Sequence, residues 1–485
     1  MSGVRQAAVW ARRSGPGPMA RVRRKSTSIR FFGAASACLL LALPAAADTW
    51  SQIYAGGGIG ADAATIDTSI TSTVSTDVLE LDGLGGGDFG ATLRVGADLQ
   101  VSSLFVLGVF ASYDWSNIDT KGSLSATDGA GTSEDYSATL LDFQYAWAVG
   151  GRAGVIVSPV TMAYGLVGYT RVAFDDPSIG YETRFNGALV DSDGGSLNMP
   201  TFSGIVFGGG LEHKLSNSVS VWGEYRQSRL GEERINVTGS DATVSIDPVL
   251  HVGRVGVSYR FGGAGSGPEA SPPPAPAGAF TGFYAGAGGG VDGITGEIAL
   301  THSDAGVIDT IGKGKGIGGG DIAGTLTAGY DAGVSGGIVA GVFGSYDRSA
   351  QDVSIEGLLG SQAVTANLPS AEQMWTIGGR LGAVIGGDVL AYGLAGYSRL
   401  SFSDLKATIG DESFAIKSEQ YDGLTLGGGF EKLVSGNFAV RAEYRYSMFG
   451  EKTIYANPED GLVVTSDPDL HSLRLIGVYR FSASN

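Results

Sequence analysis

Several short stretches of this sequence alternate with a period of two, and their charged side chains fall on one of the two alternating sets of positions. Within residues 217–227, Glu224 and Arg226 alternate with apolar and aromatic residues, and Arg254 holds the same kind of position within residues 251–261. A period of two places alternate side chains on opposite faces of a β-strand. One face is therefore apolar and aromatic, and the other mixes charges with glycine. Opposite charges gathered on one face can pair with each other or line a path for ions.

Conventional catalytic groups are scarce. The four histidines are His213, His251, His302 and His471, and none has the spacing of a paired metal-ligand motif such as HExxH. We therefore expect no enzymatic activity and no catalytic, metal-binding or cofactor-binding residue. His251 and His471 recur in matched DPxLH segments. They are candidates for contacts to lipid head groups or haem, against the simpler interpretation of polar residues at the start of a strand on the extracellular rim.

These charged positions recur because the chain repeats itself. Residues 50–261 and 280–481 contain one series of short segments in one order. Matched examples are GGGDFGATLRVGAD and GGGDIAGTLTAGYD, AYGLVGYTRVAF and AYGLAGYSRLSF, and DPVLH and DPDLH. The copies lie about 220 to 233 residues apart, which indicates a duplicated domain and is far too long for a solenoid or propeller unit.

The first 47 residues have the features of a signal peptide. A basic segment precedes an apolar run at residues 31–43, and a small-residue site follows it. We predict cleavage after Ala47, and the sequence leaves open whether translation starts at Met1 or Met19. The apolar run is too short to span a membrane.

The mature chain is expected to be acidic and free of cysteine. The whole chain has 32 basic and 49 acidic residues, and residues 1–47 hold eight of the basic ones and none of the acidic, which leaves a formal charge of −25. Nucleic acid is therefore excluded as a partner. The only cysteine, Cys38, lies in the signal segment, so the mature chain can form no disulfide or cysteine-based metal site.

The spacing of the predicted strands indicates a membrane barrel. We expect strands near residues 50–60, 88–100, 103–115, 136–157, 160–174, 201–215, 218–233 and 248–261, and near 280–290, 320–332, 336–348, 372–386, 389–404, 421–434, 437–450 and 468–481. The gaps alternate between long polar segments, such as 61–87, 116–135, 175–200 and 234–247, and tight turns. An even strand number, with short turns at one end and long loops at the other, is typical of an outer-membrane β-barrel.

The sequence therefore predicts an all-β fold of two tandem eight-stranded antiparallel transmembrane β-barrels. The first occupies residues 48–261 and the second 280–485. The Gly/Pro-rich residues 262–279 between them are predicted to be a periplasmic linker, because proline-rich segments are extended and semi-rigid. One sixteen-stranded barrel is the alternative.

Several segments carry a family resemblance. They are the opening (W/F)xxxYAGxxxG at Trp50 and Phe280, the AYGLxGY strand at Ala163 and Ala391, and the closing YRF of each copy. Each copy resembles the small eight-stranded outer-membrane barrels of the OmpA/opacity-protein class, in particular the porin-like immunogenic surface proteins of α-proteobacteria. The resemblance implies the outer membrane of a Gram-negative bacterium, contact with its lipids and lipopolysaccharide, and insertion by the barrel-assembly machinery.

The same resemblance implies an assembly signal in the final strand of a barrel. Its pattern of polar, glycine, apolar and aromatic residues is matched in full by Arg254, Gly256, Tyr259 and Phe261. The second copy matches it at Arg474, Tyr479 and Phe481, but Ile476 replaces the glycine. The alternative interpretation is an ordinary final strand with an aromatic girdle.

The charged face of each barrel is expected to line its lumen. The strand alternation assigns to this lumen charge network Arg94, Asp98, Arg152, Arg171, Glu212, Glu224, Arg226 and Arg254, and in the second copy Arg380, Arg399, Glu431, Arg441, Glu443, Arg445 and Arg474. Eight strands enclose only enough space for their own side chains, and buried charges must be paired. We therefore expect a plugged polar lumen, with a gated or narrow pore as the alternative.

The expected function follows from this lumen and from the loops. We expect a non-enzymatic integral outer-membrane protein that supports envelope structure and surface interactions. A porin-like channel for small solutes and a loop-mediated adhesin or haem binder are the alternatives. The sequence leaves open the ligand or solute and the oligomeric state.

Overall fold

The computed structural model describes most of both repeats. The described residues are 50–72, 78–127, 132–236, 242–261, 277–304, 307–316, 318–334, 336–350, 354–359, 362–367, 369–385, 388–409, 412–457 and 461–481. The predicted signal peptide and most of the predicted linker lie outside these ranges. Within them, the one helix is the short η1 (Ala277–Phe280), and no helix is long and apolar enough to cross a membrane.

The first repeat closes into a barrel, here called barrel 1. Its eight long strands are β1 (Ile53–Ser72), β2 (Val78–Gln100), β3 (Phe105–Ser116), β5 (Thr132–Ser158), β6 (Thr161–Phe174), β9 (Phe202–Lys214), β10 (Val219–Leu230) and β12 (Ala242–Phe261). Each pairs antiparallel with the next. The last strand then pairs with the first, from Ile53↔Phe261 to Ser72↔Ala242, so the ring has no free edge.

The second repeat forms barrel 2 in the same way. Its long strands are β13 (Gly282–Asp304), β15 (Gly319–Gly333), β16 (Ile338–Ser349), β19 (Ala371–Ile385), β20 (Val389–Phe402), β23 (Gln420–Ser435), β24 (Phe438–Phe449) and β26 (Leu462–Phe481). β26 pairs with β13 from Phe283↔Phe481 to His302↔Leu462. Because each repeat closes on itself, the prediction of two eight-stranded barrels is confirmed and the sixteen-stranded alternative is excluded.

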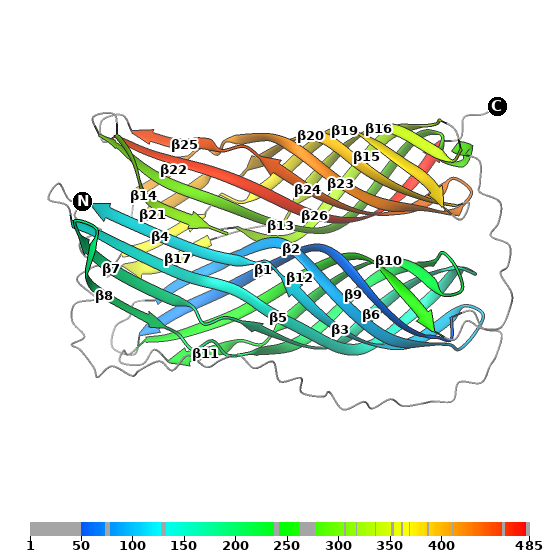
Figure 1. Ribbon diagram of the computed structural model, residues 1–485, viewed down its shortest axis with the longest axis horizontal. Coiled ribbons are helices and arrows are strands. Elements are labelled where there is room, and N and C mark those ends of the chain that lie inside the picture. Colours follow the sequence, from blue (N-terminus) through cyan, green and yellow to red (C-terminus); the bar gives the residue numbers. More distant parts are fainter. Residues whose placement is uncertain are drawn as a thin grey trace.

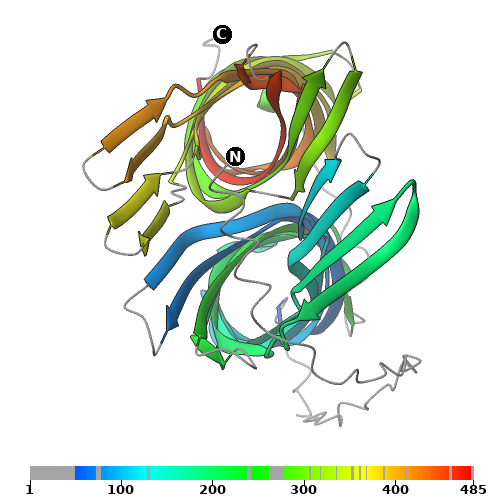
Figure 2. The same ribbon diagram turned by 90° about the vertical axis from the view of Figure 1, so that its left-hand side faces the viewer.

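The two barrels lie side by side and point the same way. Figure 1 shows both with their short turns at the right and their long hairpins at the left, and the end-on view in Figure 2 shows the two rings next to each other. The short turns connect β2 to β3, β5 to β6 and β9 to β10, and their equivalents in barrel 2.

The long connections are more ordered than the sequence predicted. Residues 61–87 were expected to be a loop, but β1 continues to Ser72 and β2 begins at Val78. Shorter strands extend the other connections: β4 (Asp119–Thr127), β7 (Ser178–Phe185), β8 (Ala188–Ser196), β11 (Glu233–Asn236), β14 (Val307–Lys315), β17 (Ser354–Leu359), β18 (Gln362–Asn367), β21 (Leu405–Ile409), β22 (Glu412–Ile416) and β25 (Lys452–Asn457). Water contacts both faces of such hairpins. Their sequences are therefore polar on both faces and lack the alternation of apolar and polar residues by which a strand is predicted.

One hairpin shows its turn chemistry directly. β7 and β8 are joined by Asn186 and Gly187, whose φ angles are 51° and 80°. Two consecutive positive φ angles define the type I′ turn that matches the twist of a two-stranded hairpin, and Asn-Gly is its preferred sequence.

The polarity of each barrel is inverted relative to a soluble protein. On β2, the side chains of Leu93 and Val95 are 56% and 54% exposed on the outer face. Arg94 and Asp98 between and beyond them point inward and are buried. An apolar outer face suits lipid, and a closed ring leaves no unpaired backbone edge for lipid to meet.

Candidate functional site in the two lumens

A buried glutamate is the centre of the lumen in barrel 1. Glu212 on β9 has no solvent exposure and accepts hydrogen bonds from three arginines. The distances to Oε atoms are 3.2 Å from Arg94 Nη2, 3.0 Å from Arg152 Nη1 and 2.7 Å from Arg260 Nη2. Arg152 and Arg260 also both pair with Asp98 on β2. These five side chains form one closed ion-pair network across the lumen.

A second chain of ion pairs continues toward the long-hairpin end. Arg226 lies between two carboxylates, with its Nη2 2.7 Å from Asp114 and its Nε 3.1 Å from Glu224. Arg254 pairs with Asp62, at 2.9 Å between Nη2 and Oδ2. Every member of this chain is buried, so each charge depends on its partners and not on water.

Barrel 2 repeats the central network at equivalent positions. Glu431 accepts from Arg380 at 3.0 Å, from Arg441 at 2.8 Å and from Arg480 at 2.7 Å. Arg380 and Arg480 also pair with Asp331. This is the arrangement around Glu212, with one of the three arginines supplied from a different strand.

The second chain is repeated as well. Arg445 pairs with Asp347 at 3.1 Å and with Glu443 at 2.6 Å. Arg474 pairs with Asp347 at 2.9 Å and with Asp292 at 2.7 Å. The structure therefore brings together most of the lumen charges that the alternation of the strands assigned to one face.

Two assignments to the lumen network were wrong. Arg171 and Arg399 lie on the outer surface and are exposed, and Arg399 pairs there with Asp422 at 2.7 Å. The reason is the strand period: Tyr164 on β6 points into the lumen, and Arg171 is an odd number of residues away. A one-residue error in counting a strand moves a side chain to the opposite face.

The strand alternation also left out members of the network. They are Asp62, Asp114 and Arg260 in barrel 1 and Asp292, Asp331, Asp347 and Arg480 in barrel 2. Arg260 could have been found, because it is an even number of residues from Arg254 on one strand. Asp62 was missed because it lies in the part of β1 that was expected to be a loop.

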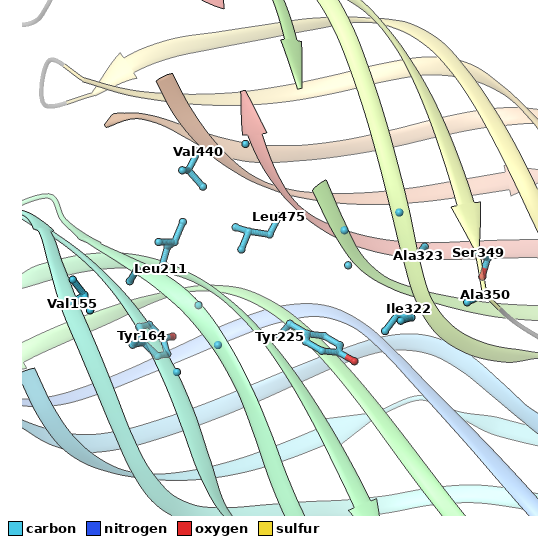
Figure 3. Close-up of a pocket in the computed structure, with 18 of the residues that line it drawn as sticks. Val155, Tyr164, Leu211, Tyr225, Ile322, Ala323, Ser349, Ala350, Val440 and Leu475 are labelled. Carbon is cyan, nitrogen blue, oxygen red and sulfur yellow. The ribbon is translucent and has the colours of Figure 1, made fainter. Parts of the chain in front are cut away.

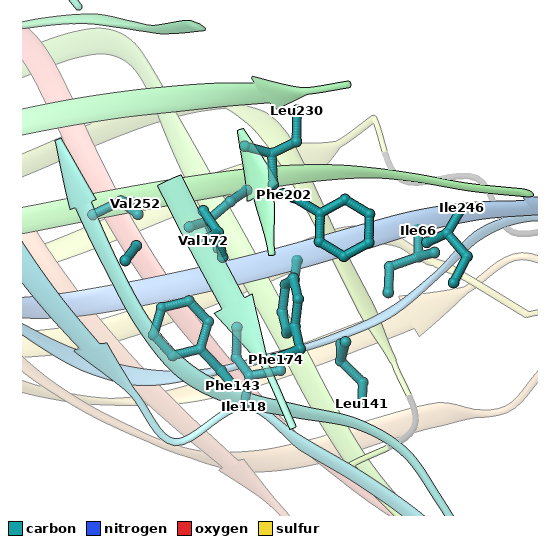
Figure 4. Packing of buried hydrophobic residues seen from close by; sticks show 13 residues of the cluster. Ile66, Ile118, Leu141, Phe143, Val172, Phe174, Phe202, Leu230, Ile246 and Val252 are labelled. Carbon is teal, nitrogen blue, oxygen red and sulfur yellow. The ribbon is translucent and has the colours of Figure 1, made fainter. Parts of the chain in front are cut away.

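Apolar side chains close the lumen of barrel 1 on both sides of the charges. Figure 4 shows the cluster toward the long hairpins, which includes Leu141, Phe143, Phe174, Phe202 and Leu230. The cluster toward the short turns contains Trp50, Val106, Phe110, Ala148, Met162, Tyr164, Leu166 and Val206. Barrel 2 has corresponding clusters, one around Leu400, Tyr421 and Phe449 and the other around Phe280, Phe343 and Ile476.

The space left among the charges in barrel 1 is very small. A cavity lined by Tyr54, Arg94, Arg152, Glu224 and Arg226 has a volume of about 10 Å³. That is room for about one water molecule. This cavity is therefore too small for a solute larger than water.

The residues of the expected assembly signal fall on both faces of the closing strands. Arg254 and Arg474 belong to the lumen networks. Tyr259 and Phe261 are about half-exposed on the outer face and meet edge to face at 5.0 Å, and Tyr479 and Phe481 do the same at 5.1 Å. Gly256 lies inside, where a methyl group would stand 2.7 Å from Cε2 of Trp222.

The two DPxLH histidines lie between the barrels and not on an open rim. His251 and His471 are 3% and 6% exposed. Their Nδ1 atoms are 2.9 Å from the hydroxyl of Tyr225 and 2.8 Å from that of Tyr444. No group of three or more His, Cys, Asp or Glu side chains in the described ranges is arranged to hold a metal ion.

Two closed antiparallel barrels with apolar outer faces and polar, side-chain-filled lumens define an integral outer-membrane β-barrel protein. The sequence matches the model of the outer membrane protein beta-barrel domain twice, at residues 32–261 and 268–481, and the chain belongs to that family. Its location is the outer membrane of a Gram-negative bacterium.

Solved outer-membrane proteins show a distant likeness. Ail, the attachment invasion locus protein of Yersinia pestis, is 12% identical over 44% of this chain and 99% of its own, with a TM-score of 0.18. Neisserial surface protein A is 15% identical over 41% and 98%, with a TM-score of 0.22. The toluene transporter TodX of Pseudomonas putida is 9% identical over 89% and 91%, with a TM-score of 0.28. Scores this low do not bear on function. No curated protein matches the sequence.

Proposed function

We propose that this protein is a non-enzymatic outer-membrane protein whose two plugged barrels support envelope structure and surface interactions. The observation that carries the proposal is the pair of buried networks around Glu212 and Glu431. Each carboxylate is held by three arginines, and no member of either network is free to meet a passing solute.

A porin-like channel is the less favoured function. Conduction needs a continuous path of water, and in each barrel the path would have to cross an ion-pair layer and two apolar layers. Opening it would break several buried pairs at once, and breaking one such pair by removing a partner costs about 3–5 kcal/mol. The networks therefore serve as cores that stabilise each barrel.

Planar-bilayer recording tests this proposal. The purified full chain should produce no nanosiemens-scale steps, with a sixteen-stranded porin measured in the same bilayers as the positive control. Reproducible steps of that size from the full chain would refute the plugged lumen and favour the channel.

Recognition through the hairpins is a second candidate, as an adhesin or haem binder. It is favoured by the ordered β-structure beyond the barrels, where β5 pairs with β7 and β7 pairs with β8. Deleting residues 178–196 should abolish haem binding, measured by absorbance, or adhesion to host cells, and leave the barrel folded. Exchanging outward Val167 and Val149 for leucine should leave both unchanged. A deletion without effect on either assay would count against recognition by this hairpin.

The processing of the chain is part of the same proposal. We infer that residues 1–47 are removed on export, that residues 262–279 form a periplasmic linker, and that the barrel-assembly machinery inserts a chain related to the OmpA/opacity proteins of α-proteobacteria. Outer-membrane lipids and lipopolysaccharide would then surround both barrels. N-terminal sequencing of the protein from outer membranes should begin at Asp48; a sequence that begins before Arg30 would contradict cleavage at Ala47.

A further inference from the structure

The two barrels contact each other through the same strands. Barrel 1 uses the outer face of β10, β12, β1 and β2, and barrel 2 uses the equivalent β24, β26, β13 and β15. Two residues are called equivalent here when they hold the same place in matched segments of the two repeats. An interface in which the same patch is used on both sides is isologous, and equivalent residues meet each other at its two-fold axis.

Backbone hydrogen bonds mark this axis near the long hairpins. Gly85 and Gly318 are equivalent, since each is the first glycine of a GGGD segment. The N–H of Gly85 donates to the carbonyl of Gly318 at 3.0 Å, and the N–H of Gly318 donates to the carbonyl of Gly85 at 3.0 Å. The two residues thus exchange identical hydrogen bonds across the barrels.

The hairpins on either side repeat the relationship strand by strand. β14 of barrel 2 pairs with β4 of barrel 1, from Gly312↔Leu124 to Lys315↔Lys121. β2 of barrel 1 pairs with β17 of barrel 2, from Leu79↔Gly357 to Asp82↔Ser354. Each residue of the β2–β17 pairs is equivalent to a residue of the β14–β4 pairs. The two pairings therefore join equivalent strands in the same register.

Packing on the barrel walls follows the same axis. Gly253 and Leu473 are equivalent, and a methyl group at Gly253 would lie 2.7 Å from Cβ of Leu473. Gly223 and Ala442 are also equivalent, and a methyl group at Gly223 would lie 2.8 Å from Cβ of Ala442. The missing side chain in barrel 1 makes room for the larger one in barrel 2.

The histidines follow the same axis. Nε2 of His471 lies 3.6 Å from Oδ1 of Asp88 in barrel 1. The equivalent His251 in barrel 1 lies within range of the charge of Asp321 in barrel 2, the equivalent of Asp88, but makes no direct ion pair with it. Both DPxLH histidines that suggested ligand contacts thus lie near an aspartate of the opposite barrel.

Grooves flank the contact on both sides. The larger, of about 1350 Å³, lies between Leu211 of barrel 1 and Leu475 of barrel 2, and Figure 3 shows these side chains on facing walls. The smaller, of about 450 Å³, lies between Phe430 of barrel 2 and Val255 of barrel 1. Leu211 is equivalent to Phe430 and Leu475 to Val255, so the two grooves are related by the same axis.

We propose that this outer face is a self-complementary barrel-recognition surface and that its partner is the other barrel of the same chain. The duplicated protein is a tethered pseudo-dimer. Gly253 and Leu473 favour contact between barrel 1 and barrel 2 over contact between the same barrel of two different chains. Two barrel 1 faces would leave a void at the axis, and two barrel 2 faces would set Leu473 against itself.

Disulfide cross-linking of the full chain in outer-membrane vesicles tests the proposal, because the predicted mature chain has no cysteine of its own. Ser123→Cys with Lys313→Cys places two exposed residues directly opposite each other across β4 and β14. Glu80→Cys with Glu356→Cys is the equivalent pair across β2 and β17. Both double variants should lose their free thiols on oxidation and remain at the mass of one chain.

Single-cysteine variants and one packing variant complete the design. The four single variants should give no covalent dimer. Adding Gly253→Leu should slow both cross-links by roughly tenfold, the factor expected from overpacking, whereas Gly151→Leu, with room for a side chain on the outer surface, should not. Covalent dimers between chains, or no cross-link in chains that show heat-modifiable migration, would overturn the proposal.

Discussion

Arg94 and Arg441 perform the same task in the two lumens from positions that are not equivalent. Arg94 on β2 binds Glu212, and Arg441 on β24 binds Glu431. The residue of barrel 2 that is equivalent to Arg94 is Thr327. The residue of barrel 1 that is equivalent to Arg441 is Trp222. The third arginine of the central network has thus moved to another strand while its carboxylate partner stayed in place.

The neighbours of the two arginines changed with them. In barrel 1 the guanidinium of Arg94 lies 3.7 Å from the ring centre of Trp222, and Gly256 leaves room for that ring. In barrel 2 the position equivalent to Trp222 is Arg441. The side chain of Ile476, which is equivalent to Gly256, packs in the apolar cluster at the short-turn end. The absent glycine in the expected assembly signal of barrel 2 has this packing explanation.

The residues that place the third arginine in barrel 1 should be replaceable by those of barrel 2 only when all of them are changed together. Arg94→Thr should destabilise barrel 1 by about 3 kcal/mol, because it removes one partner of a buried ion pair. Adding Trp222→Arg and Gly256→Ile should restore most of the loss. Urea titration with limited proteolysis, read from the protected fragment of barrel 1, measures both. A triple variant no more stable than Arg94→Thr alone would show that the exchange is not compensatory.

Removal of a central carboxylate should affect only its own barrel. Glu212→Ala leaves Arg94, Arg152 and Arg260 buried without it and should lower the stability of barrel 1 by about 3–5 kcal/mol. Glu431→Ala should do the same to barrel 2. The control is Glu232→Ala on the surface, which should leave both protected fragments unchanged. Equal loss of both barrels from Glu212→Ala alone would show that they unfold as one unit.

Ile476→Gly separates the two roles considered for the closing strand. If an assembly signal is the main role of this position, the glycine should speed insertion by the assembly machinery. We expect instead a loss of about 2–5 kcal/mol in barrel 2, because a buried isoleucine side chain is removed from a packed cluster. Insertion kinetics in membranes that contain the machinery, together with urea titration, distinguish the two. Faster insertion without loss of stability would contradict the packing explanation.

The apolar layer under the long hairpins should be as important as the charges. Phe202→Ala removes a fully buried ring that packs against Phe174 and should cost about 3–5 kcal/mol. Phe185→Ala on β7 removes a ring that is 49% exposed and should change stability by no more than about 0.5 kcal/mol. The urea midpoints of the two variants provide the comparison, and similar midpoints would rule out a structural role for the layer.

Each barrel should also close alone. A fragment of residues 48–264 contains every strand of barrel 1, so it should migrate as a heat-modifiable, protease-resistant species on a gel. A fragment of 277–485 should do the same for barrel 2. A fragment that never closes would show that a repeat needs its partner in order to fold.

The long strands could be predicted because membrane burial imposes a strict pattern on them. Side chains alternate between the lumen and the lipid along a barrel strand, so an outward Val221 and Tyr225 imply an inward Glu224 and Arg226. The same alternation correctly predicted that Glu212 and Arg254 face inward. The rule failed at Arg171 and Arg399, near the ends of their strands, where a miscount of one residue reverses the face.

Other features depend on contacts that no single strand encodes. Phe174, Phe202 and Leu230 look like any apolar residues in the sequence, and only closure of the ring brings them together inside the lumen. The position of His251 depends on a second barrel some 220 residues away in the chain. Such contacts between distant segments leave no periodic trace.

The hydrogen bonds from β4 to β14 and from β2 to β17 have a consequence for how the outer surface can vary. A change in one hairpin that disturbs its register is transmitted to a hairpin of the other barrel. On the proposed extracellular side, an antibody or phage would therefore meet a composite epitope contributed by both repeats. Escape by mutation of one repeat alone is constrained by the partner strand to which it remains bonded.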